Sequence, residues 1–193
     1  MTKLDDVRFL NGKRVYLRPV SRADIPLVLK WGNDPELRWL SSERYLPGDE
    51  IQAEQWLTSL HKQTDRMSLI LCLNNGRAIG LLGINGIDWR NRLAMTEAII
   101  GERQFWGKGY GSEAKMLLLQ HAFLTLNLRK VHAVVFQFNE RSLAHNKKCG
   151  YKVEGVQRQH VFKNGEYHDR ILLAVFREEW LPIWKKFLKT GKV

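Results

Sequence analysis

The chain has 193 residues, of which 44% are hydrophobic and 26% are charged, a balance typical of one soluble globular domain with a sizeable core. No apolar run is long enough to cross a bilayer, and the polar segment 1–8 is no signal peptide, so we expect a cytoplasmic protein that uses no membrane. The net charge of +11 favours nucleic acid or a polyphosphorylated cofactor as a partner, or serves solubility alone. Because the basic residues are dispersed and no standard nucleic-acid-binding motif occurs, we expect no direct nucleic-acid binding.

The first third of the chain predicts one strand and two helices. Residues 14–20 alternate and are rich in strand-forming types. Ser21 is a suitable N-cap for a helix that should end near Gly32. Asp49 is the N-cap expected for a second helix, whose apolar residues recur at helical spacing: Ala53, Trp56, Leu57 and Leu60.

Three strands are predicted next, over residues 68–73, 78–84 and 95–100. Asn74-Asn75-Gly76 between the first two is a hairpin-turn sequence. The third strand ends a few residues before the glycine-rich segment 105–114, which is the most informative part of the sequence.

Residues 105–114 read Phe-Trp-Gly-Lys-Gly-Tyr-Gly-Ser-Glu-Ala, with three alternating glycines ahead of a helical run. Residues without a Cβ let backbone N–H groups surround an anion, and a helix that begins there adds its positive dipole end. The segment therefore predicts a seat for a phosphate or pyrophosphate. The helix that follows has one apolar face, made of Ala114, Leu117, Leu118, His121, Ala122 and Thr125.

A buried strand over residues 131–138 completes a strand–loop–helix–strand crossover, which predicts a parallel strand pair. A short helix over 141–148 and strands over 153–162 and 170–176 follow, the strands being joined at residues 163–166. A helical tail begins near Glu178 and carries Trp180, Trp184 and Leu188 on one side. The sequence leaves open whether this tail packs on its own domain or forms a homodimer.

Two familiar phosphate motifs do not fit the glycine segment. A Walker loop needs Ser or Thr directly after Gly-Lys, whereas Lys108 is followed by Gly109. The dinucleotide fingerprint requires glycine where Ser112 stands, and several elements precede this loop.

The segment Trp106-Gly-Lys-Gly-Tyr-Gly111 instead resembles the Gln/Arg-x-x-Gly-x-Gly/Ala motif of the GNAT superfamily of N-acetyltransferases. Asn139-Glu-Arg-Ser142 with Lys148-Cys-Gly-Tyr151 resembles the superfamily's second motif. Phe162-Lys-Asn-Gly-Glu-Tyr167 resembles the late hairpin of its ribosomal-protein N-terminal and spermidine acetyltransferase branches. The resemblance extends from Arg14 to about Arg177.

The resemblance implies one α/β (α+β) domain over 1–193, with a core of about 14–177 and a helical tail over 178–193. Its sheet would be mixed and mostly antiparallel, with a splayed parallel strand pair and flanking helices. Acetyl-CoA would lie between the splayed strands. The residues implied in binding it are Ile99, Ile100, Trp106, Gly107, Lys108, Gly109, Tyr110, Gly111, Ser112, Asn139 and Asn146.

The chain departs from the superfamily pattern at the positions associated with proton transfer. Asn146 stands where many members carry a tyrosine, and the early carboxylate of the strand is displaced to Glu97. Glu97 is the candidate base if it lies in a partly dry cleft, and is otherwise an exposed or ion-paired residue. Asp88 is a weaker candidate base or a turn residue. Ser142 is either the acid for the leaving sulfur or the N-cap of the short helix.

Other chemistries have less support in the sequence. Cys72 and Cys149 form no CxxC pair, and Cys149 lies at a helix end that would not activate a thiolate. The six histidines show no metal-ligand spacing, so no metal is expected. Trp31, Trp39 and Trp56 either line an acceptor pocket or pack in the core.

In GNAT proteins the acceptor site is built largely from the first two helices and their connection. That segment is acidic here, with Asp34, Glu36, Glu43, Asp49, Glu50 and Glu54. We therefore expect acetylation of a small cationic amine such as a polyamine by direct attack in a ternary complex. The alternatives are a protein or peptide α-amine as the acceptor, and a non-catalytic CoA-binding module.

Overall fold

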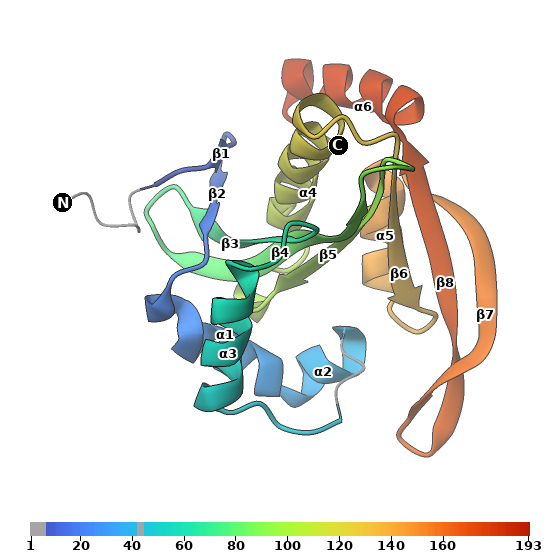
Figure 1. Cartoon of the computed structure of the whole chain (residues 1–193). Helices are drawn as coiled ribbons and strands as arrows, with labels where there is room; N and C mark the ends of the chain where they lie inside the picture. Colours follow the sequence, from blue (N-terminus) through green and yellow to red (C-terminus); the bar gives the residue numbers. More distant parts are fainter. Residues whose placement is uncertain (1–6, 42–44) are drawn as a thin grey trace.

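A single mixed sheet organises the computed structural model, which describes residues 7–41 and 45–193 (Figure 1). In this described part the sheet has eight strands in the order β1-β2-β3-β4-β5-β6-β8-β7. The strands are β1 (Leu10–Asn11), β2 (Val15–Pro19), β3 (Met67–Leu73), β4 (Ala78–Asp88), β5 (Leu93–Ile100), β6 (Lys130–Phe136), β7 (Lys152–Lys163) and β8 (Glu166–Phe176).

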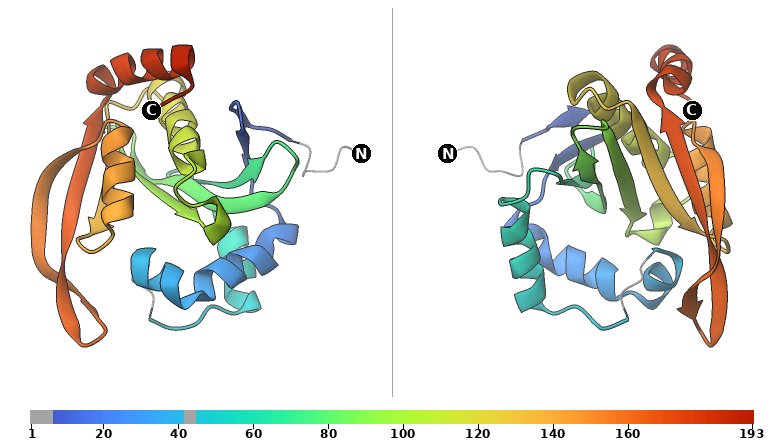
Figure 2. Two further views of the ribbon diagram at one scale, coloured as in Figure 1. Left: turned by 180° about the vertical axis from the view of Figure 1, so that it is seen from behind. Right: turned by 45° about the vertical axis from the view of Figure 1, so that its right-hand side comes forward.

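The helices lie on one face of the sheet and at both of its ends (Figure 1). Their bounds are α1 (Ile25–Asn33), α2 (Pro35–Ser41), α3 (Glu50–Leu60), α4 (Tyr110–Gln120), α5 (Glu140–Lys148) and α6 (Arg177–Thr190). Seen from behind, α4 and α5 lie in front of the sheet, while α1, α2 and α3 cluster beyond its lower end (Figure 2). The predicted α/β fold with a mixed, mostly antiparallel sheet is confirmed.

β5 and β6 form the predicted parallel pair, but only over three residue pairs, from Leu93–Lys130 to Met95–His132. Beyond that point each strand keeps only its outer neighbour: β5 pairs with β4 as far as Ile100, and β6 pairs with β8 as far as Phe136. The two strands therefore diverge, as Figure 1 shows. This divergence leaves one edge of each strand without a strand partner.

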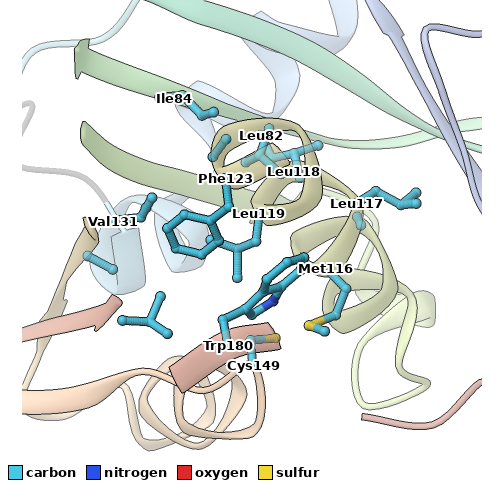
Figure 3. Close-up of a cluster of buried hydrophobic side chains, with 14 of the residues drawn as sticks. Leu82, Ile84, Met116, Leu117, Leu118, Leu119, Phe123, Val131, Cys149 and Trp180 are labelled. Carbon is cyan, nitrogen blue, oxygen red and sulfur yellow. The ribbon is translucent and has the colours of Figure 1, made fainter. Parts of the chain in front are cut away.

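The hydrophobic core lies between α4, α6 and the sheet. Trp180 of α6 is fully buried, and its ring lies 5.3 Å from Phe123 and 5.2 Å from Trp184. Figure 3 shows its indole pointing into the cluster toward Phe123 and Met116. The C-terminal tail thus packs on its own domain, which answers the question that the sequence left open.

The expected turns and caps are present. Asp49 accepts a hydrogen bond from Gln52 N (2.8 Å) and caps α3. Gly76 adopts φ 88° in the β3–β4 hairpin, and Asn164 and Gly165 adopt φ 49° and 85° between β7 and β8. Two successive residues with positive φ match the twist of paired strands.

One helix was not predicted from the sequence. The segment after Gly32 forms α2, because Asp34 Oδ1 accepts a hydrogen bond from Leu37 N (3.0 Å) and Pro35 supplies a preset φ at the first helical position. Leu37 is buried and anchors this helix. The helix after the glycine segment also ends differently, in a π-helical turn over His121–Thr125. In the described residues, no helix is long and apolar enough to span a membrane.

We predict that Trp180→Ala lowers the free energy of unfolding by about 3–5 kcal/mol, because it leaves a cavity among fully buried side chains. Urea unfolding measures the change. Leu188→Ala on the same helix removes a side chain that is 57% exposed, and should change stability by less than about 0.5 kcal/mol. Equal effects of the two substitutions would contradict the packing described for α6.

Candidate active site

A pocket of about 700 Å³ occupies the divergence between β5 and β6. Its walls are Met95 to Ile100 of β5 and Ala133 to Phe136 of β6. The N-terminal end of α4 and one side of α5 close it, and α2 borders it through Leu37 and Leu40. The element order of the chain therefore brings the glycine segment, the Asn-x-x-Ser segment and the diverging strands to one place.

The glycine segment forms the expected cradle at the start of α4. Gly107 and Gly109 adopt φ 72° and 83°, a region that side chains with a Cβ rarely enter. The first N–H groups of α4 have no partner within the helix, so they are available to an anion. Arg14 stabilises the loop by donating hydrogen bonds to the Lys108 carbonyl and to Glu113 Oε2, and both bonds are 2.9 Å long. This arrangement fits a pyrophosphate.

Trp106 contributes through its indole rather than as a substitute for the usual Gln or Arg. Its Nε1 donates a hydrogen bond to the carbonyl of Ile100 (2.7 Å), which ties the glycine segment to the end of β5. The guanidinium of Arg141 lies 3.6 Å from the centre of the same ring and lines the pocket. A cation stacked at the edge of an anion cradle adds to its attraction for phosphate. The sequence analysis missed Arg141.

The backbone of β5 turns its polar groups alternately to β4 and to the pocket. Gly101 N donates to Ile79 O (2.9 Å), and the carbonyl of Ile99 lies against Gly80. The alternation of an antiparallel ladder then directs the N–H groups of Ala98 and Ile100 into the pocket. The sequence analysis named Ile99 and Ile100, whereas the geometry favours Ala98 and Ile100 for pairing with an extended ligand.

Nine of the residues named for cofactor binding line the pocket: Ile99, Ile100, Trp106, Gly107, Gly109, Gly111, Ser112, Asn139 and Asn146. Lys108 and Tyr110 belong to the loop but do not line it. The Tyr110 ring packs instead beneath the guanidinium of Arg14, at 4.8 Å, and against Phe105.

Both polar atoms of the Asn139 side chain form hydrogen bonds within the protein. Its Oδ1 accepts a hydrogen bond from Ser142 N (3.0 Å), and its Nδ2 donates to the carbonyl of Leu40 (2.8 Å). Asn139 is therefore the N-cap of α5 and connects that helix to α2. The N-cap interpretation of Ser142 is wrong, because Ser142 lies one turn inside the helix. Its hydroxyl lines the pocket, 3.4 Å from Asn146 Nδ2.

Two buried polar atoms on α5 have no hydrogen-bond partner in the described part of the chain, namely His145 Nε2 and Asn146 Oδ1. Both residues line the pocket. Burial lowers the pKa of His145 to about 4, so its ring is neutral near neutral pH. Unpaired buried polar atoms are costly, and a ligand rich in amide groups would satisfy them. Their presence fits the pantetheine arm of coenzyme A.

Glu97 lines the pocket, but its side chain is exposed. The partly dry cleft expected around it is therefore absent, because β5 has already separated from β6 at this position. Asp88 lies outside the pocket as the last residue of β4, where its carboxylate accepts hydrogen bonds from Asn91 in the following turn that lower the pKa of Asp88. The turn interpretation of Asp88 is confirmed.

Three of the six carboxylates named for the acidic segment form ion pairs within the protein. Arg103 binds Asp34 and Glu36 at 2.8 and 2.9 Å, and Glu54 faces Arg22 at 3.4 Å. The expectation that these carboxylates attract a cationic acceptor is wrong for these three residues. Glu43 lies outside the described residues.

The three tryptophans considered for an acceptor pocket and both cysteines do not line this pocket. Trp31 is in the core, and Trp39 stacks on Phe138 with 4.2 Å between ring centroids. Trp56 also does not line the pocket. Cys149 is buried, which raises the pKa of its thiol to about 12. A thiolate nucleophile is therefore not available there.

A buried lysine beneath the pocket was missed by the sequence analysis, because it lies within an apolar helical run. Lys115 is 2% exposed, and its Nζ lies 2.9 Å from Thr96 Oγ1. Thr96 Oγ1 in turn shares a hydrogen bond of 2.7 Å with the Tyr151 hydroxyl. Burial lowers the pKa of Lys115 from 10.5 to about 8, while Cys149 and Glu97 oppose the shift.

This lysine makes stability depend on pH. The folded pKa is below that of the unfolded chain, so the unfolded chain binds more protons between about pH 8 and 10.5 and stability rises through that window. We predict that Lys115→Met raises the Tm at neutral pH, and that the gain shrinks as the pH rises through this window. Differential scanning calorimetry measures it, with the exposed Lys186→Met as the control. A gain that does not vary with pH would show that Lys115 titrates normally.

The chain was compared with known proteins. The model of the acetyltransferase (GNAT) domain matches residues 14–152. The spermidine N(1)-acetyltransferase of Escherichia coli K12 is 29% identical over 172 residues, covering 89% of this chain and 90% of that relative. The uncharacterised N-acetyltransferase YoaA of Bacillus subtilis is 32% identical over 172 residues, covering 87% of this chain and 96% of that relative.

A solved structure of spermidine N-acetyltransferase from Vibrio cholerae, in complex with CoA and spermine, shares the fold with a TM-score of 0.80. It is 22% identical and covers 88% of this chain and 99% of its own. The match of the family model to well over half of the chain shows the family. The chain belongs to the GNAT acetyltransferases and is an enzyme that transfers acetyl from acetyl-CoA to an amine.

Proposed function

We propose that this enzyme acetylates a primary amine of a small polyamine-type cation, by direct attack while both substrates are bound. The observation that carries the proposal is Glu97, the one carboxylate that lines the pocket in the described part of the chain. It lies on the open side of the divergence, where an incoming ammonium group needs both a counter-charge and a proton acceptor. Relatives that are named spermidine N(1)-acetyltransferases, such as that of E. coli K12, support this acceptor class.

The wall beside α2 favours a small acceptor over a folded protein. Lys163 on β7 donates hydrogen bonds to the carbonyls of Arg38 (2.8 Å) and Trp39 (3.0 Å) at the end of α2. Tyr45 reaches the carbonyl of Phe162 on the same hairpin (3.3 Å). These bonds join α2 and the segment after it to the long β7–β8 hairpin, and we infer that this connection restricts the space open to a bulky acceptor.

In the proposed reaction acetyl-CoA supplies an activated acyl group, and the residues of the chain position it and move protons. The cradle at Gly107 and Gly109 holds the pyrophosphate, and the pocket-facing backbone of β5 holds the extended arm. Glu97 lacks the partly dry cleft expected from the sequence, and we propose it as the proton acceptor because of its position in the pocket. Ser142 lies within the pocket as a hydrogen-bond donor. Direct attack is supported because both cysteines are buried and Cys149 has a raised pKa.

We predict that Gly109→Asp weakens acetyl-CoA binding by at least about tenfold, because it places a carboxylate in an anion cradle. Gly76→Asp is the matched control, since Gly76 has a similar φ of 88° in a hairpin far from the pocket. Isothermal titration calorimetry compares the two variants with the parent. Unchanged affinity in Gly109→Asp would place the pyrophosphate elsewhere.

We predict that Glu97→Gln lowers kcat/KM for the acceptor by ~10²-fold and alters the pH profile of kcat/KM, because it removes the proton acceptor. Asp88→Asn, which changes the turn carboxylate outside the pocket, should leave both unchanged. Steady-state assays of thiol release measure these effects. An unaltered pH profile in Glu97→Gln would reject the assignment of Glu97.

The acceptor class is tested by thiol release from acetyl-CoA with polyamines, amino sugars, amino acids and short peptides. We expect the highest kcat/KM with polyamines. A preference for peptides with a free α-amine would instead favour the second candidate, a protein N-terminal acetyltransferase.

A further inference from the structure

Lys115 is a buried cation without a buried counter-ion. Its Nζ has one hydrogen-bond partner in the described part of the chain, Thr96 Oγ1, although an ammonium group has three N–H donors. No carboxylate among the described residues lies within ion-pair distance of it. An apolar side chain would pack here at lower cost, so the lysine is unfavourable for folding. Because Lys115 lowers the stability of the fold and lies at the base of a pocket, we consider a role for it in the reaction.

Lys115 lies between the anion cradle at the start of α4 and the point where β5 and β6 separate. It lies four residues after Gly111, so it occupies the same face of α4 as the anion cradle, one turn deeper. Its partner Thr96 is the first residue of β5 beyond the last pair with β6. Lys115 therefore lies where the two strands part, at the closed end of the pocket that it lines.

Acetyl transfer in this pocket creates a negative charge. When the amine nitrogen bonds to the acyl carbon, the carbon–sulfur bond breaks and its electron pair goes to sulfur. The coenzyme A thiolate must then be stabilised or protonated before it leaves. The superfamily tyrosine is replaced by Asn146, and an amide does not donate a proton at neutral pH.

We propose that Lys115 is the catalytic residue that receives the departing sulfur: its ammonium group stabilises the thiolate, and its Nζ supplies the proton with which coenzyme A leaves. This inference rests on the proposed acetyl transfer. The acceptor ammonium releases one proton to solvent and attacks as the neutral amine, which then loses a second proton to Glu97. The sulfur gains one proton from Lys115. Glu97 returns its proton to solvent, and neutral Lys115 is reprotonated from solvent through the pocket. Thr96 and Tyr151 hold the ammonium group in place through their shared hydrogen bond.

The groups around Lys115 support this assignment over its neighbours. Glu97 on β5 and Cys149 at the end of α5 raise its pKa, but burial outweighs them and leaves the pKa at about 8. Such a group is protonated at neutral pH and still gives up its proton readily. Burial lowers the pKa of His145 to about 4, so that ring is not protonated, and burial raises the pKa of Tyr151 far above its ordinary value.

A measurement without turnover tests the proposal. Coenzyme A with a free thiol is bound to the enzyme, and the ultraviolet absorbance of the thiolate is followed as the pH is raised. We expect the wild type to lower the pKa of the bound thiol by about one unit below its ordinary value of about 8.5, a tenfold rise in thiolate at a given pH. In Lys115→Met this shift should disappear, and in Lys186→Met it should persist.

Kinetics provide the second readout. In Lys115→Met, kcat should fall ~10²-fold while the KM for acetyl-CoA changes little. Lys115→Gln, which retains an N–H donor toward Thr96, should show the same loss even if the methionine variant folds poorly. An equal thiol pKa in wild type and variants would overturn the role of Lys115 and leave the proposed acetyl transfer intact. Failure of the wild type to bind coenzyme A would overturn both.

Discussion

The parting of β5 and β6 is the constraint on which the rest of the structure depends. A sheet interrupted at its centre leaves N–H and C=O groups without partners, which is costly unless each strand is held from its other side. β4 holds β5 and β8 holds β6 through antiparallel pairing along their lengths. Each strand therefore keeps one hydrogen-bonded neighbour, and the opening presents two strand edges to an extended molecule, as a missing strand would.

Local features of the helix starts position the residues that surround this opening. Gly109 starts α4 at the open end, where the helix dipole meets the pocket. Asn139 caps α5 and binds α2 through Leu40, so one side chain fixes two walls. The buried polar atoms of Lys115, His145 and Asn146 then line a space that an all-apolar core would fill more favourably. The site is built at some cost to folding, as expected where function conflicts with packing.

Much of the fold and the cradle could be predicted from the sequence. Strand alternation, turn residues and the glycine spacing are local signals. They located seven of the eight strands in the described residues and the hairpins, and they predict a phosphate seat that the geometry at Gly107 and Gly109 fits. The long-range features could not be predicted. The ion pairs of Arg103 with Asp34 and Glu36 join residues about seventy positions apart, so the acidic segment was read as free charge.

The sequence also misleads about the burial of Lys115 and Glu97, because the burial of each depends on where β5 and β6 separate. Lys115 is in a helical run where a charged residue normally faces solvent, and only the position of Thr96 shows that it is buried at the strand divergence. Glu97 follows the alternation of a half-buried strand, yet it is exposed because β6 has moved away from it. By contrast α2, which was not predicted, does have a local signal in the sequence, the Asp34-Pro35 cap.

The central claim is that acetyl-CoA binds as an extended strand between β5 and β6. Amide hydrogen exchange resolved to single residues tests it most directly, with and without acetyl-CoA. We predict new protection at the pocket-facing amides of Ala98 and Ile100 and at the start of α4, with little change in the β7–β8 hairpin tip. Protection confined to surfaces outside the β5–β6 opening would contradict this account.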